Sequence, residues 1–138
     1  MTIDDLEEVA LMEQRCFSMP WSKNAYEQAL KSDNVIYIVA KDGQRIVGSC
    51  GVRNILSEGE ITNVMIDEPF RGKGISYPML QKLLEEGKKI GVCQFFLEVR
   101  AGNKSAIGLY KKCGFIVEGV RKNMYEMPVE DGLVMWKR

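Results

Sequence analysis

The segment RGKGIS, at residues 71–76, combines two glycines with two cationic side chains. An apolar, β-branched run at 60–66 precedes it, and a run with helical periodicity at 75–90 follows it. Free backbone N–H groups and the dipole at the start of such a helix form a site for an anion. Glycines let the backbone approach a pyrophosphate without a Cβ clash. Because Arg71 and Lys73 add positive charge, the segment predicts a phosphate-binding loop.

Four interpretations of this loop compete. A P-loop requires GxxxxGK followed by Ser or Thr, which the sequence lacks. A Rossmann fingerprint requires GxGxxG after the first strand, but Tyr77 stands where the third glycine belongs and three predicted strands come before it. A coenzyme A pyrophosphate loop, with Gln or Arg three residues before Gly, matches at Arg71 and Gly74 and departs at Ser76, where Gly or Ala is expected. The fourth interpretation is an ordinary glycine-rich turn.

The elements expected around the loop follow from hydrophobic periodicity. A capping box of Thr2 and Asp5 opens a predicted helix to residue 17, residues 18–21 break the chain, and Ser22 caps a second helix to residue 30. Strands are predicted at 35–40, 45–53, 60–66, 94–99, 115–120 and 133–137, and helices at 75–90 and 103–112. The short link between the second and third strands favours antiparallel pairing. This order predicts an α/β (α+β) fold, with a mixed, mostly antiparallel sheet of six to seven strands and helices on both faces.

The composition limits the classes of function. The 138 residues suffice for a single domain spanning 1–138, with 46% apolar and 28% charged residues. The 19 basic and 19 acidic side chains cancel, so no excess charge favours nucleic acid or a membrane surface. No apolar run approaches the roughly 20 residues of a membrane helix, and the acidic start lacks a signal-peptide core. We therefore expect a cytoplasmic protein that binds neither nucleic acid nor membrane.

Histidine is absent, which excludes Ser-His and Cys-His nucleophilic machinery and every histidine-based metal site. The four cysteines lack the two-residue spacing of zinc knuckles and redox motifs. Two of them, Cys50 and Cys93, lie within apolar runs and are predicted to be buried free thiols. Proton transfer must then use carboxylates, Tyr, Lys, Cys or water, and we expect no metal.

Three longer segments, one of which contains the loop, decide which interpretation of the loop is favoured. They are ITNVMIDEPFRGKGI at 61–75, FFLEVRAGNKSAIGLYKKCGF at 95–115 and VRKNMYEMPVEDGLVMW at 120–136. Together they resemble the GNAT superfamily of N-acetyltransferases, and most closely its RimI branch of ribosomal-protein-alanine N-acetyltransferases. MEQRCFSMPWS, at 12–22, is similar to that branch's opening segment. The resemblance covers nearly the whole chain and implies the GNAT fold, with acetyl-CoA as cosubstrate and no metal.

The resemblance also implies roles for individual residues. Glu98, in LEVR, corresponds to the family's general base, and Tyr110, in LY, to its general acid. The positions that correspond to contacts with the cosubstrate are Val64, Met65, Ile66, Arg71, Gly72, Lys73, Gly74, Ile75, Ser76, Tyr77 and Asn103. Taken singly, a strand-end glutamate is usually a solvated charge and a helical tyrosine before Gly-Phe usually packs in the core. Their ordered combination favours catalysis.

Elementary chemistry agrees with these roles. An α-amino group, with a pKa of about 8, must lose a proton before it attacks a thioester. Glu98 could take that proton through water, and Tyr110, twelve positions later on the following helix, could protonate the departing thiolate. A backbone N–H near Ile66 could hold the carbonyl oxygen as it becomes negative. Direct transfer needs only alignment of amine and thioester.

The acceptor implied by the RimI branch is the amino-terminal alanine of a ribosomal protein. Two segments match the acceptor side, residues 13–21 and residues 121–131, and the residues predicted to contact the acceptor are Glu13, Phe17, Trp21, Asn123 and Tyr125. Acidic groups there could hold a cationic peptide end, and alanine suits a narrow slot.

Three departures from the family pattern qualify this reading. Met124 stands where the branch usually has Tyr, Ser76 replaces Gly or Ala, and the family's usual first strand is missing. The sheet then has six strands, unless a neighbouring chain or another start codon supplies the edge. Two other functions remain open. One is a GNAT enzyme for a small amine or lysine, and the other is a non-catalytic module that binds acyl-CoA or a partner.

Overall fold

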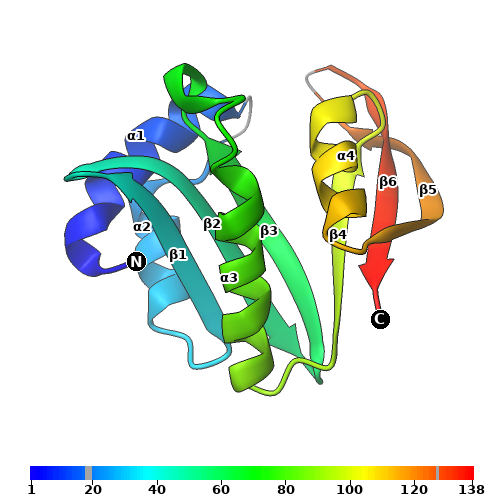
Figure 1. The fold of residues 1–138 in the computed structure, drawn as a ribbon, viewed down its shortest axis with the longest axis horizontal. Helices are drawn as coiled ribbons and strands as arrows, with labels where there is room; N and C mark the ends of the chain where they lie inside the picture. Colours follow the sequence, from blue (N-terminus) through cyan, green and yellow to red (C-terminus); the bar gives the residue numbers. More distant parts are fainter. Residues whose placement is uncertain (18–19, 127) are drawn as a thin grey trace.

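The structure, a computed structural model, describes residues 1–17, 20–126 and 128–138 as a sheet with helices packed on it (Figure 1). In chain order the elements are η1 (Ile3–Asp5), α1 (Leu6–Cys16), α2 (Lys23–Leu30), β1 (Val35–Asp42), β2 (Arg45–Ile55), β3 (Glu58–Ile66), η2 (Glu68–Phe70), α3 (Ser76–Lys89), β4 (Gln94–Arg100), α4 (Lys104–Lys112), β5 (Ile116–Tyr125) and β6 (Glu130–Lys137). Ser18 and Met19, which belong to the predicted chain break, lie outside the described residues.

The sheet has six strands in the order β1-β2-β3-β4-β6-β5. Neighbouring strands are antiparallel except β3 and β4, which are parallel. The predicted mixed, mostly antiparallel sheet is therefore confirmed, as is the antiparallel pairing of the second and third strands.

The parallel strands β3 and β4 pair over a short stretch only. The paired positions are Glu58 with Gln94, Gly59 with Phe95 and Glu60 with Phe96. Beyond them the strands diverge, and in Figure 1 they separate toward the ends that lead to α3 and α4. This divergence opens the sheet where the glycine-rich loop and the start of α4 lie.

Two apolar clusters cover the two faces of the sheet. On one face, α3 contributes Met79, Leu80, Leu83 and Leu84, whose spacing of one, three and four residues places them on a single side of the helix. On the other face, Leu6, Val9 and Met12 of α1 pack with Tyr26 of α2 and with strand residues. The prediction of helices on both faces is confirmed.

A β-bulge interrupts the pairing of β2 with β3. The register shifts between Ser49 and Gly51, and Asn63 of β3 adopts a left-handed backbone with φ of 54°. The extra residue changes which face the following side chains meet. Ile61 belongs to the α3 cluster, Met65 belongs to the α1 cluster, and Val64 and Ile66 pack against the α3 cluster.

The chain ends differ from the prediction in two places. The first helix begins as the 3₁₀ turn η1, because Asp5 accepts hydrogen bonds from the backbone and hydroxyl of Thr2 and holds the first turn tight. The last two strands are longer than predicted, and the Asp131 carboxylate accepts from the backbone N–H of Asn123 at 2.9 Å, which extends their hairpin.

Among the described helices, none has the length and apolar character needed to cross a bilayer.

Candidate active site

A cavity of about 450 Å³ lies between the end of β3, the glycine-rich loop, the start of α3 and one side of α4. Its lining consists of Cys16, Phe17, Val64, Met65, Ile66, Phe70, Arg71, Gly72, Gly74, Ile75, Ser76, Asn103, Ser105, Ala106, Leu109 and Tyr110. The cavity therefore joins the predicted phosphate loop to the predicted general acid.

The glycine-rich loop leaves open space for a ligand. Gly72 and Gly74 have φ of 76° and 77°, a conformation that favours glycine, and a Cβ built on either would meet nothing within 4 Å. α3 begins at Ser76, so the N–H groups of its first turn lack helical partners. Arg71 is anchored beside them, because its Nε donates to the Ile66 carbonyl at 2.9 Å. Open space, free N–H groups and positive charge fit a diphosphate.

Two residues predicted to contact the cosubstrate do not line this cavity. Lys73 instead lies with its Nζ 5.5 Å from the centre of the Phe70 ring, and Tyr77 carries the Lys112 Nζ 4.4 Å from its ring centre. The end of β3 does line it, through Val64, Met65 and Ile66.

Glu98 lies on the sheet face opposite the α3 cluster. Along β4, Phe95, Leu97 and Val99 are buried in that cluster, and strand alternation turns Glu98 the other way. The Glu98 side chain is one-quarter exposed, and its Oε1 accepts a hydrogen bond from Arg121 Nη1 at 2.9 Å. The predicted base is therefore paired with a cation on β5 and lies outside the cavity lining.

Tyr110 reaches the cavity from α4. Asn103 caps this helix, since its side chain accepts from the backbone N–H of Ala106 at 3.1 Å, and Ala106 and Tyr110 follow at helical spacing. The Tyr110 ring is buried and lies edge-on to Phe115, with 6.0 Å between ring centres. Burial raises the pKa of Tyr110 above its usual range, so the phenol keeps its proton at neutral pH.

A comparison with protein families decides what this arrangement is. The sequence model of the acetyltransferase (GNAT) family matches residues 6–115. The chain belongs to this family. It is therefore an acetyl-CoA-dependent N-acetyltransferase, as the resemblance implied. The family's use of acetyl-CoA agrees with a loop that fits a diphosphate.

Two bacterial relatives match nearly the whole of this GNAT chain. A Bacillus subtilis protein, provisionally named ribosomal protein bS18-alanine N-acetyltransferase, is 33% identical over 99% of this chain and 91% of its own. The Escherichia coli (strain K12) ribosomal protein bS18-alanine N-acetyltransferase is 30% identical over 95% of this chain and 90% of its own. A crystal structure of the Escherichia coli enzyme superposes with a TM-score of 0.90 at 27% identity, covering 99% of this chain and 89% of that one. The GNAT fold and the RimI-like character are thereby confirmed.

The residues of the first predicted acceptor segment of this GNAT enzyme lie partly in the cavity lining and partly in the core. Phe17 lines the cavity, whereas Trp21 packs against the rings of Tyr26 and Tyr37, with 5.3 Å and 6.1 Å between ring centres. Glu13 is almost fully buried, with an exposed fraction of 2%. Both of its oxygens accept hydrogen bonds from inside the protein.

The second predicted acceptor segment lies on the β5–β6 hairpin. Asn123 is exposed, and Tyr125 is half-buried under the Arg100 guanidinium, 4.5 Å from its ring centre. Burial raises the pKa of Tyr125, and the negative charge of Glu98 raises it further. Glu130 ties this hairpin to the turn after β4, because its Oε2 accepts from the Gly102 N–H at 2.6 Å.

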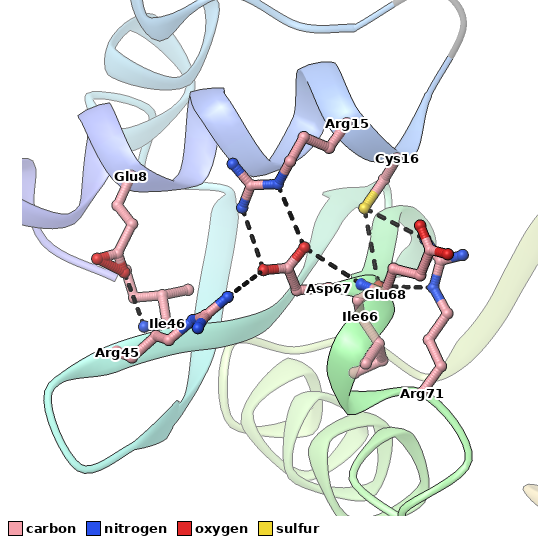
Figure 2. A network of polar contacts seen from close by, with 9 residues as sticks. All are labelled: Glu8, Arg15, Cys16, Arg45, Ile46, Ile66, Asp67, Glu68 and Arg71. Carbon is pink, nitrogen blue, oxygen red and sulfur yellow. Dashed lines mark hydrogen bonds and ion pairs between the residues drawn. The ribbon is translucent and has the colours of Figure 1, made fainter.

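A buried carboxylate anchors the start of the phosphate loop. Figure 2 shows Arg15 of α1, Arg45 of β2 and the backbone N–H of Glu68 converging on Asp67, at distances of 3.1 to 3.3 Å. Asp67 is only 2% exposed. Burial by itself would raise the pKa of Asp67, but the hydrogen bonds from Arg15 and Arg45 outweigh it and the pKa is lowered. The carboxylate thus stays charged and joins three elements immediately before the loop.

Sequence reasoning missed several residues of the site. The α4 residues Ser105, Ala106 and Leu109 line the cavity. A usable signal existed for Ala106, because it lies three residues after Asn103 and four before Tyr110 and therefore shares their helix face. Cys16 and Phe70 also line it, and we find no local signal for them. In the described part of the chain, no group of three acidic, cysteine or histidine side chains could hold a metal.

Proposed function

We propose that this GNAT enzyme transfers the acetyl group of acetyl-CoA to the amino-terminal alanine of a ribosomal protein. The observation that carries the proposal is the single cavity that joins the glycine-rich loop, the end of β3 and Tyr110. The likeness to the Escherichia coli ribosomal protein bS18-alanine N-acetyltransferase, over 95% of this chain, supports the choice of acceptor.

On the cosubstrate side, the loop from Arg71 to Ser76 would hold the diphosphate of acetyl-CoA through backbone N–H groups. The backbone of residues 64–66 would lie along the pantetheine and acetyl portion. Asn103, Lys73 and Tyr77 remain predicted contacts. Of these three, Asn103 is supported by its place in the cavity lining.

The base and the acid would act from opposite sides of the opened sheet. Glu98 faces away from the α3 cluster, and Tyr110 belongs to that cluster. Glu98 would accept a proton from the acceptor ammonium through water, and Tyr110 would donate its proton to the departing sulfur. A backbone N–H near Ile66 would stabilise the oxygen that becomes negative during attack. No acyl-enzyme is required, because alignment of amine and thioester suffices.

On the acceptor side, the proposal keeps Phe17, Trp21, Asn123 and Tyr125 as predicted contacts. Phe17 is the best supported, because it lines the cavity beside the end of β3. Direct contact by Glu13 stays a prediction, since both of its oxygens already accept hydrogen bonds within the protein.

Mass spectrometry of acetyl-CoA reactions tests the proposal. The substrates are a peptide that begins with alanine, the same peptide with a blocked amino terminus and one internal lysine, and spermidine. We expect acetylation of the alanine α-amine alone. Acetylation of the lysine or of spermidine, with an inert alanine peptide, would replace this acceptor by the small-amine alternative.

The variant Glu98→Gln separates catalysis from binding. It keeps the shape of the side chain and removes its basicity, so we expect acetyl transfer to slow by about 10²- to 10⁴-fold while coenzyme A still binds. An unchanged rate would remove Glu98 from the mechanism. Absence of transfer to every amine by the wild-type chain, with coenzyme A bound, would favour the binding-module alternative.

A further inference from the structure

Glu13 stands at the centre of a buried polar network that the chemistry above does not use. Its Oε2 accepts from the backbone N–H of Trp21 at 2.9 Å, and its Oε1 accepts from the Tyr26 hydroxyl and from Asn63 Nδ2, the latter at 3.4 Å. These described partners are all neutral donors. A buried carboxylate without a cation is costly, so packing alone does not account for a glutamate here.

The partner on β3 is the residue that makes the bulge. Asn63 has a left-handed backbone, which costs a residue with a Cβ roughly 1–2 kcal/mol. Its two side-chain ends are both held, because Nδ2 donates to Glu13 and Oδ1 accepts from the Tyr37 hydroxyl at 3.1 Å. The network therefore stabilises a conformation that the backbone would otherwise avoid.

This bulge sets the direction of the strand end that lines the cavity. Without the extra residue, strand alternation would place residue 65 on the same face as Ile61. With it, Met65 joins the α1 cluster, while Val64 and Ile66 pack on the α3 side. The backbone groups of residues 64–66 turn with their side chains, so Asn63 fixes how this strand end meets the cavity.

The same carboxylate also holds Trp21, which lies between α1 and α2. Trp21 donates its backbone N–H to Glu13, and its ring packs on Tyr26, whose hydroxyl donates to Glu13 as well. Phe17, earlier in that segment, lines the cavity. One side chain is thus bonded both to the strand end proposed to meet the acetyl group and to the segment proposed to meet the acceptor.

We propose that Glu13 is a positioning residue for acetyl transfer, which aligns the end of β3, through Asn63, with the acceptor-side segment, through Trp21. The inference rests on the proposed function, because it assigns the two ends of the network to the two substrates. A misplacement of about 1 Å between reacting groups can slow a reaction by about 10²-fold, so loss of the network should act on kcat.

A double-mutant cycle tests this inference. Glu13→Gln places an amide against the Asn63 amide, and Asn63→Asp places a second carboxylate against Glu13. Asn63→Asp breaks the bond between the two side chains. Glu13→Gln breaks a bond either to Asn63 or to Trp21, because its single amide oxygen cannot accept at both positions. The double change restores it with donor and acceptor exchanged. We expect kcat to fall about 10- to 100-fold in each single variant and to recover by at least about fivefold in the double variant, the factor that corresponds to about 1 kcal/mol of coupling.

The readout is kcat per coenzyme A site, with the sites counted by titration calorimetry. Normalisation removes any unfolded fraction, so a merely structural role would leave this quantity unchanged and reduce only the number of sites. The variant Asn63→Gly adds a second route, because glycine accepts a φ of 54° without strain while losing both side-chain bonds. It should remain folded and still lose kcat, with KM for acetyl-CoA nearly unchanged.

Asp5→Asn is the matched control. Asp5 is a buried carboxylate at the other end of the same helical segment, and it bonds Thr2 and Lys41. It should lower stability without changing kcat per site. An unchanged kcat per site in Glu13→Gln and Asn63→Gly overturns the inference, as does a double variant no faster than the singles. Each variant is compared with the wild type on the amine that the wild type acetylates. If that amine is not an amino-terminal alanine, the proposed function fails, and the test of Glu13 can still be carried out.

Discussion

The carboxylate of Glu98 on β4 accepts a hydrogen bond from the guanidinium of Arg121 on β5, with 2.9 Å between Oε1 and Nη1. The residue proposed to receive a proton from a cationic amine is therefore already paired with a cation. Arg121 is 60% exposed along its side chain, so the pair contributes little to folding. Its influence should fall mainly on the acceptor, which carries the same charge as Arg121.

Replacing Arg121 with Gln tests this competition. We expect KM for the acceptor peptide to fall by up to about fivefold, the factor that corresponds to about 1 kcal/mol, the upper end for an exposed ion pair. Steady-state kinetics with varied peptide measures the effect. Arg138→Gln is the control, because Arg138 forms a comparable exposed ion pair, at 2.8 Å, with Glu118 of β5, the strand that also contains Arg121. An equal change in both variants would assign the effect to overall charge.

A methyl group at Gly74 should interfere with the cosubstrate. Gly74→Ala puts a Cβ into the open space of the phosphate loop and strains a backbone with φ of 77°. Gly43→Ala imposes the same strain, with φ of 63°, in the turn between β1 and β2. Both should lose roughly 1–2 kcal/mol of stability. Only Gly74→Ala should raise KM for acetyl-CoA, by roughly tenfold or more; equal KM values would place the diphosphate elsewhere.

Tyr110 should act as an acid over a wide pH range. Burial raises its pKa above the usual value of about 10, so the phenol stays protonated throughout the neutral and mildly alkaline range. Tyr110→Phe should lower kcat by about 10²- to 10⁴-fold. Because the folded chain holds this proton more tightly than the unfolded chain does, stability should decrease as pH rises above about 10. Urea titrations of both proteins from pH 8 to about 11 would detect a smaller loss in the variant.

Asp67→Asn should weaken the anchor before the phosphate loop. The buried carboxylate accepts from two arginines, and hydrogen bonds to charged groups contribute about 1.5–3 kcal/mol, so we expect a loss of about 2 kcal/mol at pH 7. The pKa of Asp67 is lowered in the folded chain. Its contribution is therefore present above about pH 4 and disappears as pH falls through that pKa. Wild type and variant should become equally stable in strong acid, as urea unfolding at several pH values would measure.

The parts of the site that follow from local sequence could be predicted. The glycine-rich loop is found at residues 71–76 because its glycines, cations and helix start are contiguous. Asn103 and Tyr110 share one helix whose boundaries local patterning gives, since Asn103 caps it and Gly114 follows it. The sheet's mixed character followed from the order of elements.

The two networks behind the loop could not be predicted in the same way. Glu13 is 50 positions from Asn63, and Arg15 is 52 positions from Asp67. No pattern along the chain indicates which carboxylate a tertiary contact will bury. For the same reason, the sequence predicts that Glu13 contacts the acceptor, because it belongs to the acceptor-side segment, whereas its side chain lies inside the protein.

The prediction of buried thiols was correct for Cys50 and wrong for Cys93. Both lie in apolar runs, but burial depends on where the strand begins. β4 starts at Gln94, so Cys93 lies just before the strand, and its side chain is exposed. A run of a few apolar residues in the sequence does not determine at which residue the strand begins to pair.

Because β3 and β4 pair at three positions only, a short seam joins the two halves of the sheet. Past these three positions, the described parts of β3 and β4 share no backbone ladder. A molecule that carries amides of its own, laid between them, would act as a guest strand and tie the halves together. Such a guest binds the folded chain and not the unfolded one, so its concentration adds to stability by mass action. The thermal stability of the folded protein should then rise with the concentration of coenzyme A or of acetyl-CoA, since both carry the same amides.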